Sequence, residues 1–220
     1  MKHSEGEPPQ AIEQEPPSAE AIFGEQIDLA RRFTADLARH GEELGLIGPL
    51  EPGRLWSRHI LNSAVVAPLL HTGGRVGDIG SGAGLPGLVL AIARPDVEMV
   101  LIEPMERRCE WLRAEVERLG LRNVTVLRAR AEEALSAAPL DQVTARAVSA
   151  LRTLIPITAP LVRAGGELLF LKGARVQEEV SAAAKQIRTH KLSAIEVLVL
   201  GEGVAPEATR LFRATVDEAS

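Results

Sequence analysis

The spacing of apolar residues changes along the chain and divides it into a short N-terminal part and a longer C-terminal part. Residues 24–40 place apolar side chains at the steps of a helix, and residues 55–70 form a second helical stretch. From Arg75 onward, apolar runs of four to six residues alternate with helical periods. Such alternation predicts a doubly wound α/β fold with a mainly parallel sheet. The candidate strands are 75–79, 98–102, 123–127, 141–146, 166–171, 194–200 and 210–216.

Local signals at two places refine this layout. Only a loop, Gly201 to Thr209, separates the last two candidate strands, so these strands should pair antiparallel. The helix that follows Glu103 should begin at Pro104, where the missing N–H does no harm, and should end at Gly120. Its apolar stripe predicts these buried side chains: Met105, Cys109, Leu112, Val116 and Leu119.

The chain divides into three parts. Residues 1–20 are rich in Glu and Pro and are predicted to be a disordered acidic tail. Residues 21–72 are predicted to form a helical extension, and residues 73–220 the α/β domain. The formal net charge is −5, and the tail holds most of that excess. The body is therefore near neutral, which leaves room for a local basic surface.

The cysteine count and the apolar runs bear on where in the cell the protein works. A single cysteine, Cys109, excludes an internal disulfide, and the N-terminus lacks the apolar core of a signal peptide. The most apolar run, Leu85 to Ala93, is too short to span a bilayer. We therefore expect a soluble cytoplasmic protein with no membrane partner. No metal is expected either, because metal-ligand spacing is absent from these histidines: His3, His40, His71 and His190.

A glycine-rich turn follows the first candidate strand. The run from Asp78 to Gly87 reads Asp-Ile-Gly-Ser-Gly-Ala-Gly-Leu-Pro-Gly, and Glu103 closes the next strand. Glycines let a ligand approach the backbone closely, and the helix after them offers free N–H groups at its start. A carboxylate at the end of the second strand suits a ribose diol. The pattern predicts a nucleoside cofactor.

Two registers of this run point to different cofactors. From Gly82, the spacing Gly-x-Gly-x-x-Gly satisfies the dinucleotide fingerprint, with Glu103 near the expected distance. From Gly80, the glycines follow the strand directly and Asp78 precedes them, which resembles the first motif of class I S-adenosylmethionine methyltransferases. An acid there would repel a pyrophosphate but suits a cationic sulfonium ligand. Methyl transfer is favoured; dinucleotide binding and a purely structural turn are the alternatives.

The absence of two sequence features narrows the choice of the atom that accepts the methyl group. Adenine amino-group methyltransferases carry an Asn/Asp-Pro-Pro-aromatic motif after the fourth strand, where residues 144–148 read Thr-Ala-Arg-Ala-Val. Methylation of pyrimidine carbon 5 needs a cysteine nucleophile, and Cys109 lies on an apolar helix stripe. Acceptors with an available lone pair, such as guanine N7, remain. In-line attack by such an atom needs alignment and no general base.

Arginines are concentrated between residues 107 and 130. They outnumber the acids there and could meet phosphates, or they could form an ordinary solvated surface; both interpretations stay open. These cations are Arg107, Arg108, Arg113, Arg118, Arg122, Arg128 and Arg130.

A resemblance to one family rests on six stretches in a single order along the chain. They are Arg58-His59-Ile60-Leu61-Asn62-Ser63, the run from Asp78 to Gly87, Arg94-Pro95, Arg128-Ala129-Arg130-Ala131-Glu132-Glu133, Arg146-Ala147 and Leu171-Lys172-Gly173. From about Phe23 to Val216, the chain resembles the family of 16S ribosomal RNA guanine-N7 methyltransferases, also called the glucose-inhibited division protein B family. The pairing of the Arg-His-Ile-Leu helix with Gly-Leu-Pro-Gly is more specific than any count of glycines.

The resemblance implies a fold, a reaction and a partner. The fold is α/β and Rossmann-like, with seven mainly parallel strands, an antiparallel last strand and an N-terminal helical extension. The reaction is S-adenosylmethionine-dependent methylation of N7 of a guanine in the decoding-region loop of 16S rRNA. The expected partner is 16S rRNA or the small ribosomal subunit. Apart from the resemblance, we expect the enzyme to be a monomer. The implied cofactor contacts are Gly80, Ser81, Gly82, Leu85, Glu103, Ala131, Glu132 and Arg146.

On the RNA side we predict phosphate or base contacts from Arg58, His59, Arg107 and Lys172. No catalytic base is assigned, and Arg146 and Lys172 are the candidates for positioning. Lys172 ends a buried strand on the ligand side of an open sheet, which supports its placement. A lone histidine is more often structural, so His59 is the weaker candidate.

Two departures from the family pattern affect the first strand and the substrate side. Gly77 stands where a bulky residue is usual and should weaken the strand. Asn62 stands where many members have Asp, which puts any acidic role there in doubt. Beside the methyltransferase, two functions remain as alternatives: a dinucleotide-dependent oxidoreductase and a non-catalytic nucleotide-sensing protein.

Overall fold

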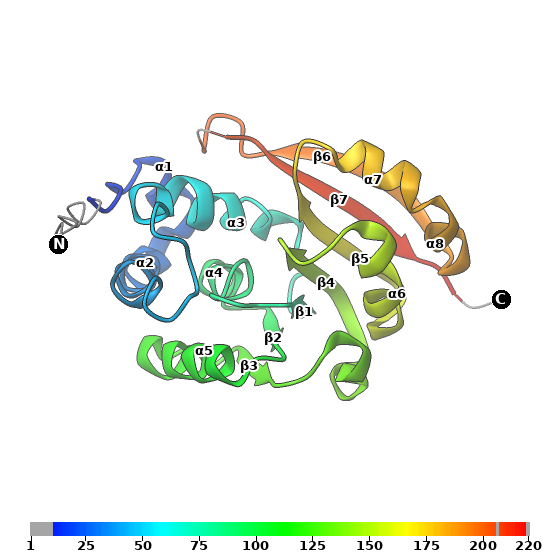
Figure 1. The fold of residues 1–220 in the computed structure, drawn as a ribbon, viewed down its shortest axis with the longest axis horizontal. Coiled ribbons are helices and arrows are strands. Elements are labelled where there is room, and N and C mark those ends of the chain that lie inside the picture. Colours follow the sequence, from blue (N-terminus) through cyan, green and yellow to red (C-terminus); the bar gives the residue numbers. More distant parts are fainter. Residues whose placement is uncertain (1–10, 206, 219–220) are drawn as a thin grey trace, which may run out of the picture.

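One seven-stranded sheet forms the centre of the computed structural model, which describes residues 11–205 and 207–218. The strand order is β3-β2-β1-β4-β5-β7-β6 (Figure 1). β3, β2, β1, β4 and β5 pair in parallel, and β7 pairs antiparallel with both β5 and β6. The predicted doubly wound sheet with a closing hairpin is confirmed. The strands are β1 (Arg75–Ile79), β2 (Glu98–Ile102), β3 (Val124–Leu127), β4 (Leu140–Arg146), β5 (Val162–Lys172), β6 (Leu192–Leu200) and β7 (Thr209–Val216).

Helices cover both faces of the sheet (Figure 1). Within β5, Leu169 and Leu171 join the core that packs beneath α1–α5, whereas Leu168 and Phe170 join the core on the side of α6–α8. This alternation follows from the two-residue period of a strand. The helices within the α/β domain are α4 (Gly87–Ala93), α5 (Glu106–Leu119), η5 (Ala131–Ala137), α6 (Leu151–Thr158), η6 (Ala159–Leu161), α7 (Val176–Ala182) and α8 (Ala184–Thr189).

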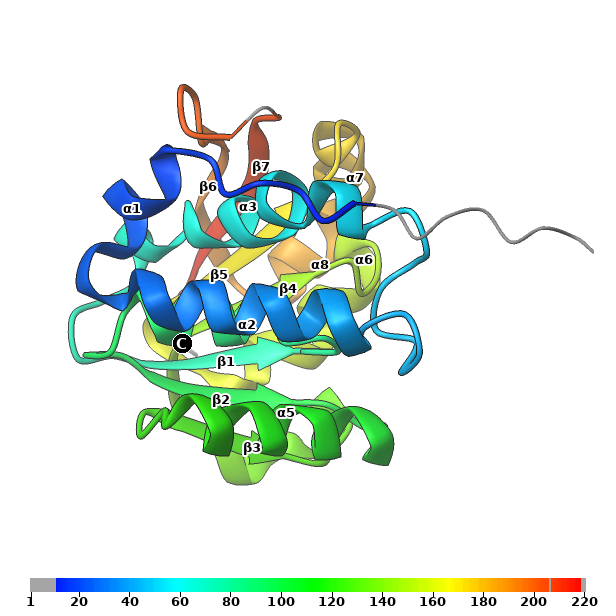
Figure 2. The same ribbon diagram turned by 90° about the vertical axis from the view of Figure 1, so that its left-hand side faces the viewer.

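The N-terminal extension packs on the face that carries α4 and α5. Helix α2 packs against η3, α4 and α5, and in Figure 2 it runs in the same direction as β1, with the segment after His40 toward the carboxyl edge of the sheet. Residues 55–70, predicted as one helix, instead form a π-helix followed by shorter turns. The elements of the extension are α1 (Ser18–Phe23), η1 (Gly24–Gln26), α2 (Ile27–His40), η2 (Pro52–Arg54), η3 (Leu55–Leu61), α3 (Asn62–Ala64) and η4 (Ala67–Leu69).

The predicted disorder of the tail is wrong for residues 11–20, and residues 1–10 lie outside the described part of the chain. Helix α1 begins at Ser18, and Ala19 is fully buried in the core. Both carboxylate oxygens of Glu15 accept hydrogen bonds from Arg31, at 2.6 and 2.8 Å. The acidic residues of this segment are therefore held by a cation of α2, which composition alone does not reveal.

Helix α5 begins later than predicted. Met105 has an extended backbone, and the helix starts at Glu106. The N–H of Met105 donates to Oε1 of Glu103 at 3.0 Å, which holds the chain in a turn before the helix. Met105 is consequently exposed, and its predicted burial is wrong. Gly120 ends the helix in the left-handed conformation, as predicted.

Gly77 allows close packing within the sheet. A methyl group on Gly77 would lie 2.6 Å from Cδ1 of Leu140, the first residue of β4. The absence of a side chain at this position therefore leaves the space that Leu140 fills.

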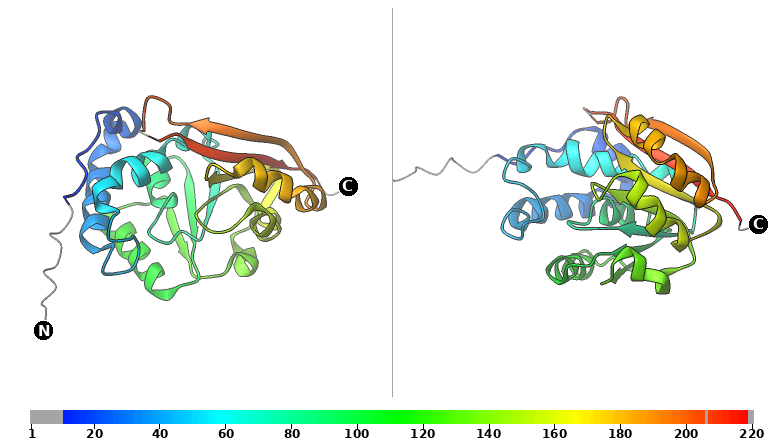
Figure 3. Two further views of the ribbon diagram at one scale, coloured as in Figure 1. Left: turned by 45° about the horizontal axis from the view of Figure 1, so that its top comes forward. Right: turned by 45° about the vertical axis from the view of Figure 1, so that its right-hand side comes forward.

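The β6–β7 hairpin lies at one edge of the sheet, with α7 and α8 beside it (Figure 3). Phe212 of β7 stacks on Phe170 of β5 with ring centroids 5.9 Å apart. Among residues 11–205 and 207–218, the helices are all too short or too polar to cross a membrane.

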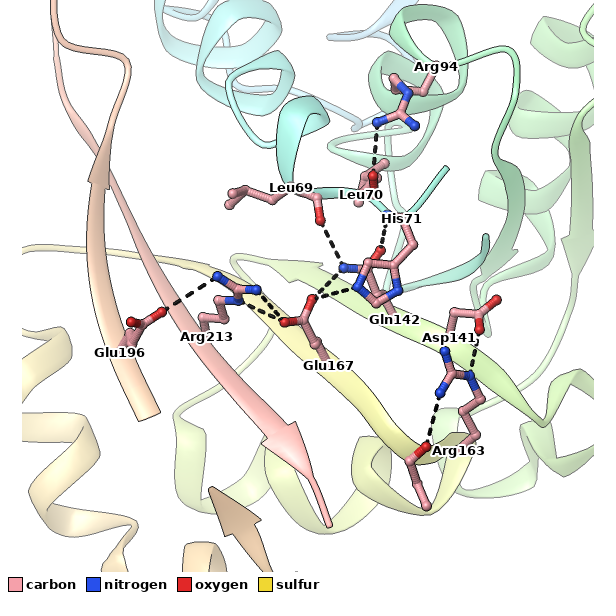
Figure 4. A network of polar contacts seen from close by, with 11 residues as sticks. Leu69, Leu70, His71, Arg94, Asp141, Gln142, Arg163, Glu167, Glu196 and Arg213 are labelled. Carbon is pink, nitrogen blue, oxygen red and sulfur yellow. Dashed lines mark hydrogen bonds and ion pairs between the residues drawn. The ribbon is translucent and has the colours of Figure 1, made fainter. Parts of the chain in front are cut away.

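A polar network joins the extension to the amino ends of β4 and β5 (Figure 4). One carboxylate oxygen of Glu167 accepts from Arg213 at 2.6 and 2.8 Å. The other accepts from Gln142 at 2.7 Å and lies 3.2 Å from Nε2 of His71. Gln142 also binds the backbone of His71 and Leu69, which leads into β1. These contacts fix the extension against the edge of the sheet opposite the glycine loop.

Candidate active site

The carboxyl ends of β1, β2, β4 and β5 meet at one edge of the sheet. The chain passes from β1 to β2 on one side, and β4 lies on the other side of β1. Open α/β sheets bind ligands at this switch point, outside the carboxyl ends of the strands. The glycine loop, Glu103, Arg146 and Lys172 all follow or end these strands. The sequence-predicted residues are thus brought to one edge.

The glycine loop follows β1 directly. Gly80, Gly82 and Gly84 all have positive φ angles, which residues with a Cβ adopt only at a cost. The N–H of Gly80 donates to the carbonyl of Ile102 at 2.8 Å, so the loop is tied to the end of β2. A methyl group on Gly80 would lie 2.9 Å from Cγ2 of Val148, in the loop after β4. Glycine is required here for both conformation and space.

Asp78 lies beneath this loop and is fully buried. Its carboxylate accepts from the hydroxyl of Thr144 and from the N–H of Gly87, each at 3.1 Å. A methyl group on Gly87 would lie 2.6 Å from Oδ2 of Asp78. Burial raises the pKa of Asp78 to about 7, although these hydrogen bonds and that of Ser81 act in the opposite direction. Asp78 therefore organises the loop from below.

Glu103 closes the loop from the side of β2. Its Oε2 accepts from the N–H of Gly82 at 2.9 Å, and its Oε1 accepts from the N–H of Met105. Nη1 of Arg108 lies 3.9 Å from the same carboxylate. The side chain is 2% exposed. A carboxylate has about four lone-pair positions, so two remain for further donors such as ribose hydroxyls.

The other predicted cofactor contacts surround this loop. Ser81 is buried, and its hydroxyl donates to the carbonyl of Asp78 at 2.9 Å. Leu85 is partly buried at the end of the loop. Ala131 is buried and Glu132 is exposed, at the start of η5 after β3.

A cavity of about 460 Å³ opens beside the loop at the ends of β4 and β5. It contains cationic side chains from three elements: η3, β4 and β5. Ser149 contributes a buried hydroxyl oxygen that has no hydrogen-bond partner among the described residues. Such an atom is a candidate ligand contact. The lining residues are Arg58, Asn62, Arg146, Ala147, Val148, Ser149, Leu171, Lys172, Gly173 and Glu179.

Arg146 reaches from the end of β4 to the π-helix η3. Its Nη2 donates to the carbonyl of Arg58 at 3.1 Å and to Nδ1 of His59 at 2.8 Å. Its Nη1 donates to the hydroxyl of Ser63 at 3.2 Å. Burial lowers the pKa of Arg146 to about 10, and the charge of Arg58 adds to this effect. Arg146 stays cationic near pH 7 and is rigidly held.

Lys172 lies across the same cavity. Its ammonium donates to the carbonyl of Ser149 at 2.6 Å and pairs with Glu179 at 2.8 Å. Its side chain is 9% exposed. Glu179 also accepts from the N–H of Leu151 at the start of α6. The lysine is therefore a fixed charge at the wall of the cavity.

The predicted RNA contacts occupy different environments. Arg58 is exposed at the cavity, whereas His59 is held between Glu51 and Arg146 with 12% of its side chain exposed. Arg107 is exposed at the start of α5 and approaches Gly45 of the extension. It lies outside the lining of the cavity. The structure thus groups Arg58, Arg146 and Lys172 and leaves His59 turned inward.

Sequence reasoning missed Glu51, whose carboxylate binds the ring of His59 at 2.5 Å. Glu51 belongs to no motif, and only the packing of η2 against η3 brings it to the site. Ser149 was also missed, because a single serine in a loop carries no pattern.

The glycine loop and Glu103 fit a nucleoside with a ribose diol. Three glycines of the loop present backbone without a Cβ atom, and Glu103 retains free acceptor positions. Asp78 lies below the loop, and its ionised form would repel an anionic pyrophosphate. Within the described residues, no cluster of three or more His, Cys, Asp or Glu side chains has the geometry of a metal site.

Solved structures with the same fold include S-adenosylmethionine-dependent methyltransferases. One from Aquifex aeolicus is 18% identical, with a TM-score of 0.55 over 75% of this chain and 93% of that one. A precorrin-6y C5,15-methyltransferase from Geobacter metallireducens has a TM-score of 0.52 at 17% identity, covering 70% and 85%. The architecture is the class I methyltransferase fold.

Sequence relatives are much closer. "Ribosomal RNA small subunit methyltransferase G" of Leifsonia xyli subsp. xyli is 65% identical over 206 residues, covering 94% of this chain and 98% of the relative. The protein of the same name from Clavibacter michiganensis subsp. michiganensis is 62% identical over 208 residues, with the same coverage. The family model described as rRNA small subunit methyltransferase G matches residues 26–208. This chain therefore belongs to the rRNA small subunit methyltransferase G family, as the resemblance of its motifs predicted.

Proposed function

We propose that this chain transfers a methyl group from S-adenosylmethionine to N7 of one guanine in the decoding-region loop of 16S rRNA. Family membership supports rRNA of the small subunit as the substrate. The observation that carries the assignment is the juxtaposition of two sites at one sheet edge. The glycine loop with Glu103 suits the nucleoside, and the cavity bounded by Arg146 and Lys172 suits a nucleotide.

S-adenosylmethionine supplies a methyl group on a cationic sulfur. We propose that Glu103 accepts hydrogen bonds from the ribose hydroxyls and that Gly80, Ser81, Gly82 and Leu85 line the chain of the cofactor. Ala131 and Glu132 would border the adenine, after β3. Arg146 borders the cofactor on the side of the cavity. The carboxyl of Asp78, when ionised, favours a cation over an anion at this place.

The methyl transfer needs no catalytic base. The N7 lone pair of guanine forms the new N–C bond as the methyl–sulfur bond breaks, and the positive charge passes from sulfur to the purine. No proton is removed from N7. The task of the protein is therefore to hold the purine in line with the methyl group.

Cationic side chains would hold the RNA around the cavity. Arg58 and Lys172 bound the cavity from opposite sides, and Arg146 lies between them. Arg107, at the start of α5, is proposed to meet a phosphate farther along the RNA. These contacts are electrostatic, so binding of the small subunit should weaken as salt rises. We propose that a monomer acts on the small ribosomal subunit in the cytoplasm.

A methyl-transfer assay tests the function. The protein is incubated with labelled S-adenosylmethionine and small subunits from a strain that lacks this gene, and the label is mapped on the RNA. We expect one labelled guanine, with loss of label for Gly80→Ala and Arg146→Ala. Protein-free 16S rRNA is tested in parallel to identify the preferred form of the substrate.

The assay also separates the alternatives. Absence of transfer, together with no thermal stabilisation by S-adenosylmethionine or S-adenosylhomocysteine, would contradict the proposal. Stabilisation by NAD(H) in place of these compounds would support the oxidoreductase. Stabilisation by S-adenosylmethionine without transfer to any form of the RNA would support a non-catalytic sensor.

A further inference from the structure

A continuous chain of side chains runs from the extension to the wall of the cavity. Oε2 of Glu51 lies 2.5 Å from Nε2 of His59, and Nδ1 of His59 lies 2.8 Å from Nη2 of Arg146. The three side chains come from separate parts of the sequence. Glu51 precedes η2, His59 belongs to η3, and Arg146 ends β4.

The donors and acceptors in this chain determine the state of the imidazole. Arg146 can only donate, so Nδ1 of His59 must accept, and its Nε2 must carry the proton that Glu51 accepts. Burial lowers the pKa of His59, and the guanidinium of Arg146 lowers it further, which favours the same neutral form. His59 thus has one tautomer, and both ring nitrogens are occupied.

Glu51 is itself held in place as a carboxylate. Partial burial acts to raise the pKa of Glu51, but hydrogen bonds from His59 and Arg54 outweigh it and the net shift is downward. Arg54 binds the other carboxylate oxygen at 2.7 Å. Arg58 faces the same carboxylate at 3.7 Å. These contacts fix the carboxylate of Glu51, which in turn fixes the orientation of the His59 ring.

The π-helix completes the cradle around Arg146. The carbonyl groups of Arg58 and His59 accept from its guanidinium at 3.1 and 3.4 Å. π-Helical turns are rare and often occur at functional sites, since they redirect backbone groups. Here the turn aims two carbonyl groups at one arginine. The guanidinium has a single orientation at the cavity wall because it is clamped by backbone on one side and by imidazole on the other.

We propose that Glu51 and His59 are positioning residues of the methyl transfer, which act by fixing the guanidinium of Arg146 at the border between cofactor and target base. The inference rests on the function proposed above. It replaces a direct contact of His59 with RNA, because both ring nitrogens of His59 face protein groups. It also gives the N-terminal extension a part in the reaction, in addition to its packing against the sheet.

Substitutions that keep or remove single hydrogen bonds test this role. In His59→Asn, the amide oxygen can take the place of Nδ1 and accept from Arg146, whereas His59→Leu leaves no acceptor. In Glu51→Gln, the amide oxygen can still accept from Nε2, whereas Glu51→Ala cannot. We expect His59→Leu and Glu51→Ala to lower kcat by up to roughly 100-fold, as small misplacements do. His59→Asn and Glu51→Gln should recover most of that loss.

The KM for small subunits separates positioning from direct RNA contact. A residue that acts through Arg146 should lower kcat at saturating small subunits, whether or not this KM changes as well. A rise in KM with kcat preserved, in His59→Leu or Glu51→Ala, would overturn the inference. Thermal melting of each variant identifies loss of folded protein, and the two conservative variants keep the test valid if the truncated ones unfold.

A double-mutant cycle supplies the second test. The rate of a single turnover is measured for His59→Leu, for Arg146→Lys and for the double variant. If His59 acts through Arg146, the leucine substitution should have little further effect once the forked guanidinium is lost. Independent, multiplying losses would overturn the inference while the wild-type protein still labels its guanine. Failure of the wild type to label any guanine would instead overturn the proposed function.

Discussion

The backbone N–H of Gly82 donates to Oε2 of Glu103 across 2.9 Å, so the glycine loop and the acid at the end of β2 hold each other. The side chain of Glu103 is almost fully buried by this contact. The loop and the carboxylate therefore form one unit. A nucleoside that binds to either must satisfy both.

Removal of the Glu103 carboxylate should weaken cofactor binding. Hydrogen bonds to a charged group contribute about 1.5–3 kcal/mol, so Glu103→Ala should raise the Kd for S-adenosylmethionine by roughly 10- to 100-fold. Calorimetric titration measures this value. Glu106→Ala is the control, since Glu106 is an exposed acid three residues farther on at the start of α5. Equal affinity for Glu103→Ala and wild type would exclude a ribose contact.

Gly80 and Gly120 offer a matched pair of alanine substitutions. Their φ angles are +67° and +69°, so both should lose about 1–2 kcal/mol of stability from left-handed backbone strain. A methyl group on Gly80 would also meet Val148 at 2.9 Å, whereas one on Gly120 meets nothing within 4 Å. We expect Gly80→Ala to lose activity and Gly120→Ala to keep it. Urea unfolding and the methyl-transfer assay provide the two readouts, and equal activity of the two variants would contradict this prediction.

The buried carboxyl of Asp78 should make stability depend on pH. Its pKa is raised to about 7 in the folded protein from an ordinary value of 3.8. Between these values the folded state binds a proton that the unfolded state releases, so rising pH favours unfolding by up to about 1.4 kcal/mol for each pH unit. Stability from this group is fully present below the unfolded pKa and is lost as pH rises through 7.

Asp78→Asn removes this titration. In this variant the N–H of Gly87 loses the carboxylate oxygen that accepts its hydrogen bond. The free energy of unfolding at pH 5 should therefore be lower than that of the wild type. Relative to wild type, the variant should then gain stability as pH rises from 5 to 7. Unfolding in urea at several pH values measures the difference. If the difference between the two proteins stays constant over this range, Asp78 does not titrate there.

Buried parallel strands were the part of the fold that sequence predicted best. β1 and β2 have the predicted bounds. β2 contains the continuous apolar run typical of a strand covered on both faces, and the glycine turn marks the end of β1. β5 begins at Val162, four residues before the prediction, since Gly165 and Gly166 interrupt the apolar pattern without ending the strand. Helix bounds were less accurate where side-chain contacts decided them, as at Met105 and in the segment around Glu15.

Sequence predicted the site only for those residues whose proximity follows from the order of the strands along the chain. Gly80 and Glu103 stand at the ends of adjacent strands, and topology alone brings such positions together. The contact of Glu51 with His59 depends on how η2 packs against η3, and that of His59 with Arg146 on how the extension packs on β4. A sequence pattern contains no distance between such segments, so sequence reasoning gave His59 an outward role.

Lys172 should contribute to RNA binding through its fixed charge. Its ammonium is held by Ser149 and Glu179, and the side chain is 9% exposed. Lys172→Met keeps the length of the side chain and removes the charge. With about 1.5–3 kcal/mol for a charged hydrogen bond, kcat/KM for small subunits should fall roughly 10- to 100-fold. Lys185→Met, an exposed lysine on α8, is the control. An unchanged kcat/KM for Lys172→Met would exclude a substrate contact.

Glu167 should stabilise the protein without affecting the cofactor site. Its buried carboxylate accepts from Arg213 and Gln142 at the amino ends of the strands, opposite the glycine loop (Figure 4). Glu167→Ala leaves these donors unsatisfied and should cost roughly 2–4 kcal/mol. Glu196→Ala removes the exposed partner of Arg213, 3.6 Å away, and should cost less than about 1 kcal/mol. Urea unfolding measures both values. The Kd for S-adenosylmethionine should stay at the wild-type value in each variant, because the network acts on the docking of the extension. A higher Kd in the folded Glu167→Ala protein would show that the two edges of the sheet are coupled.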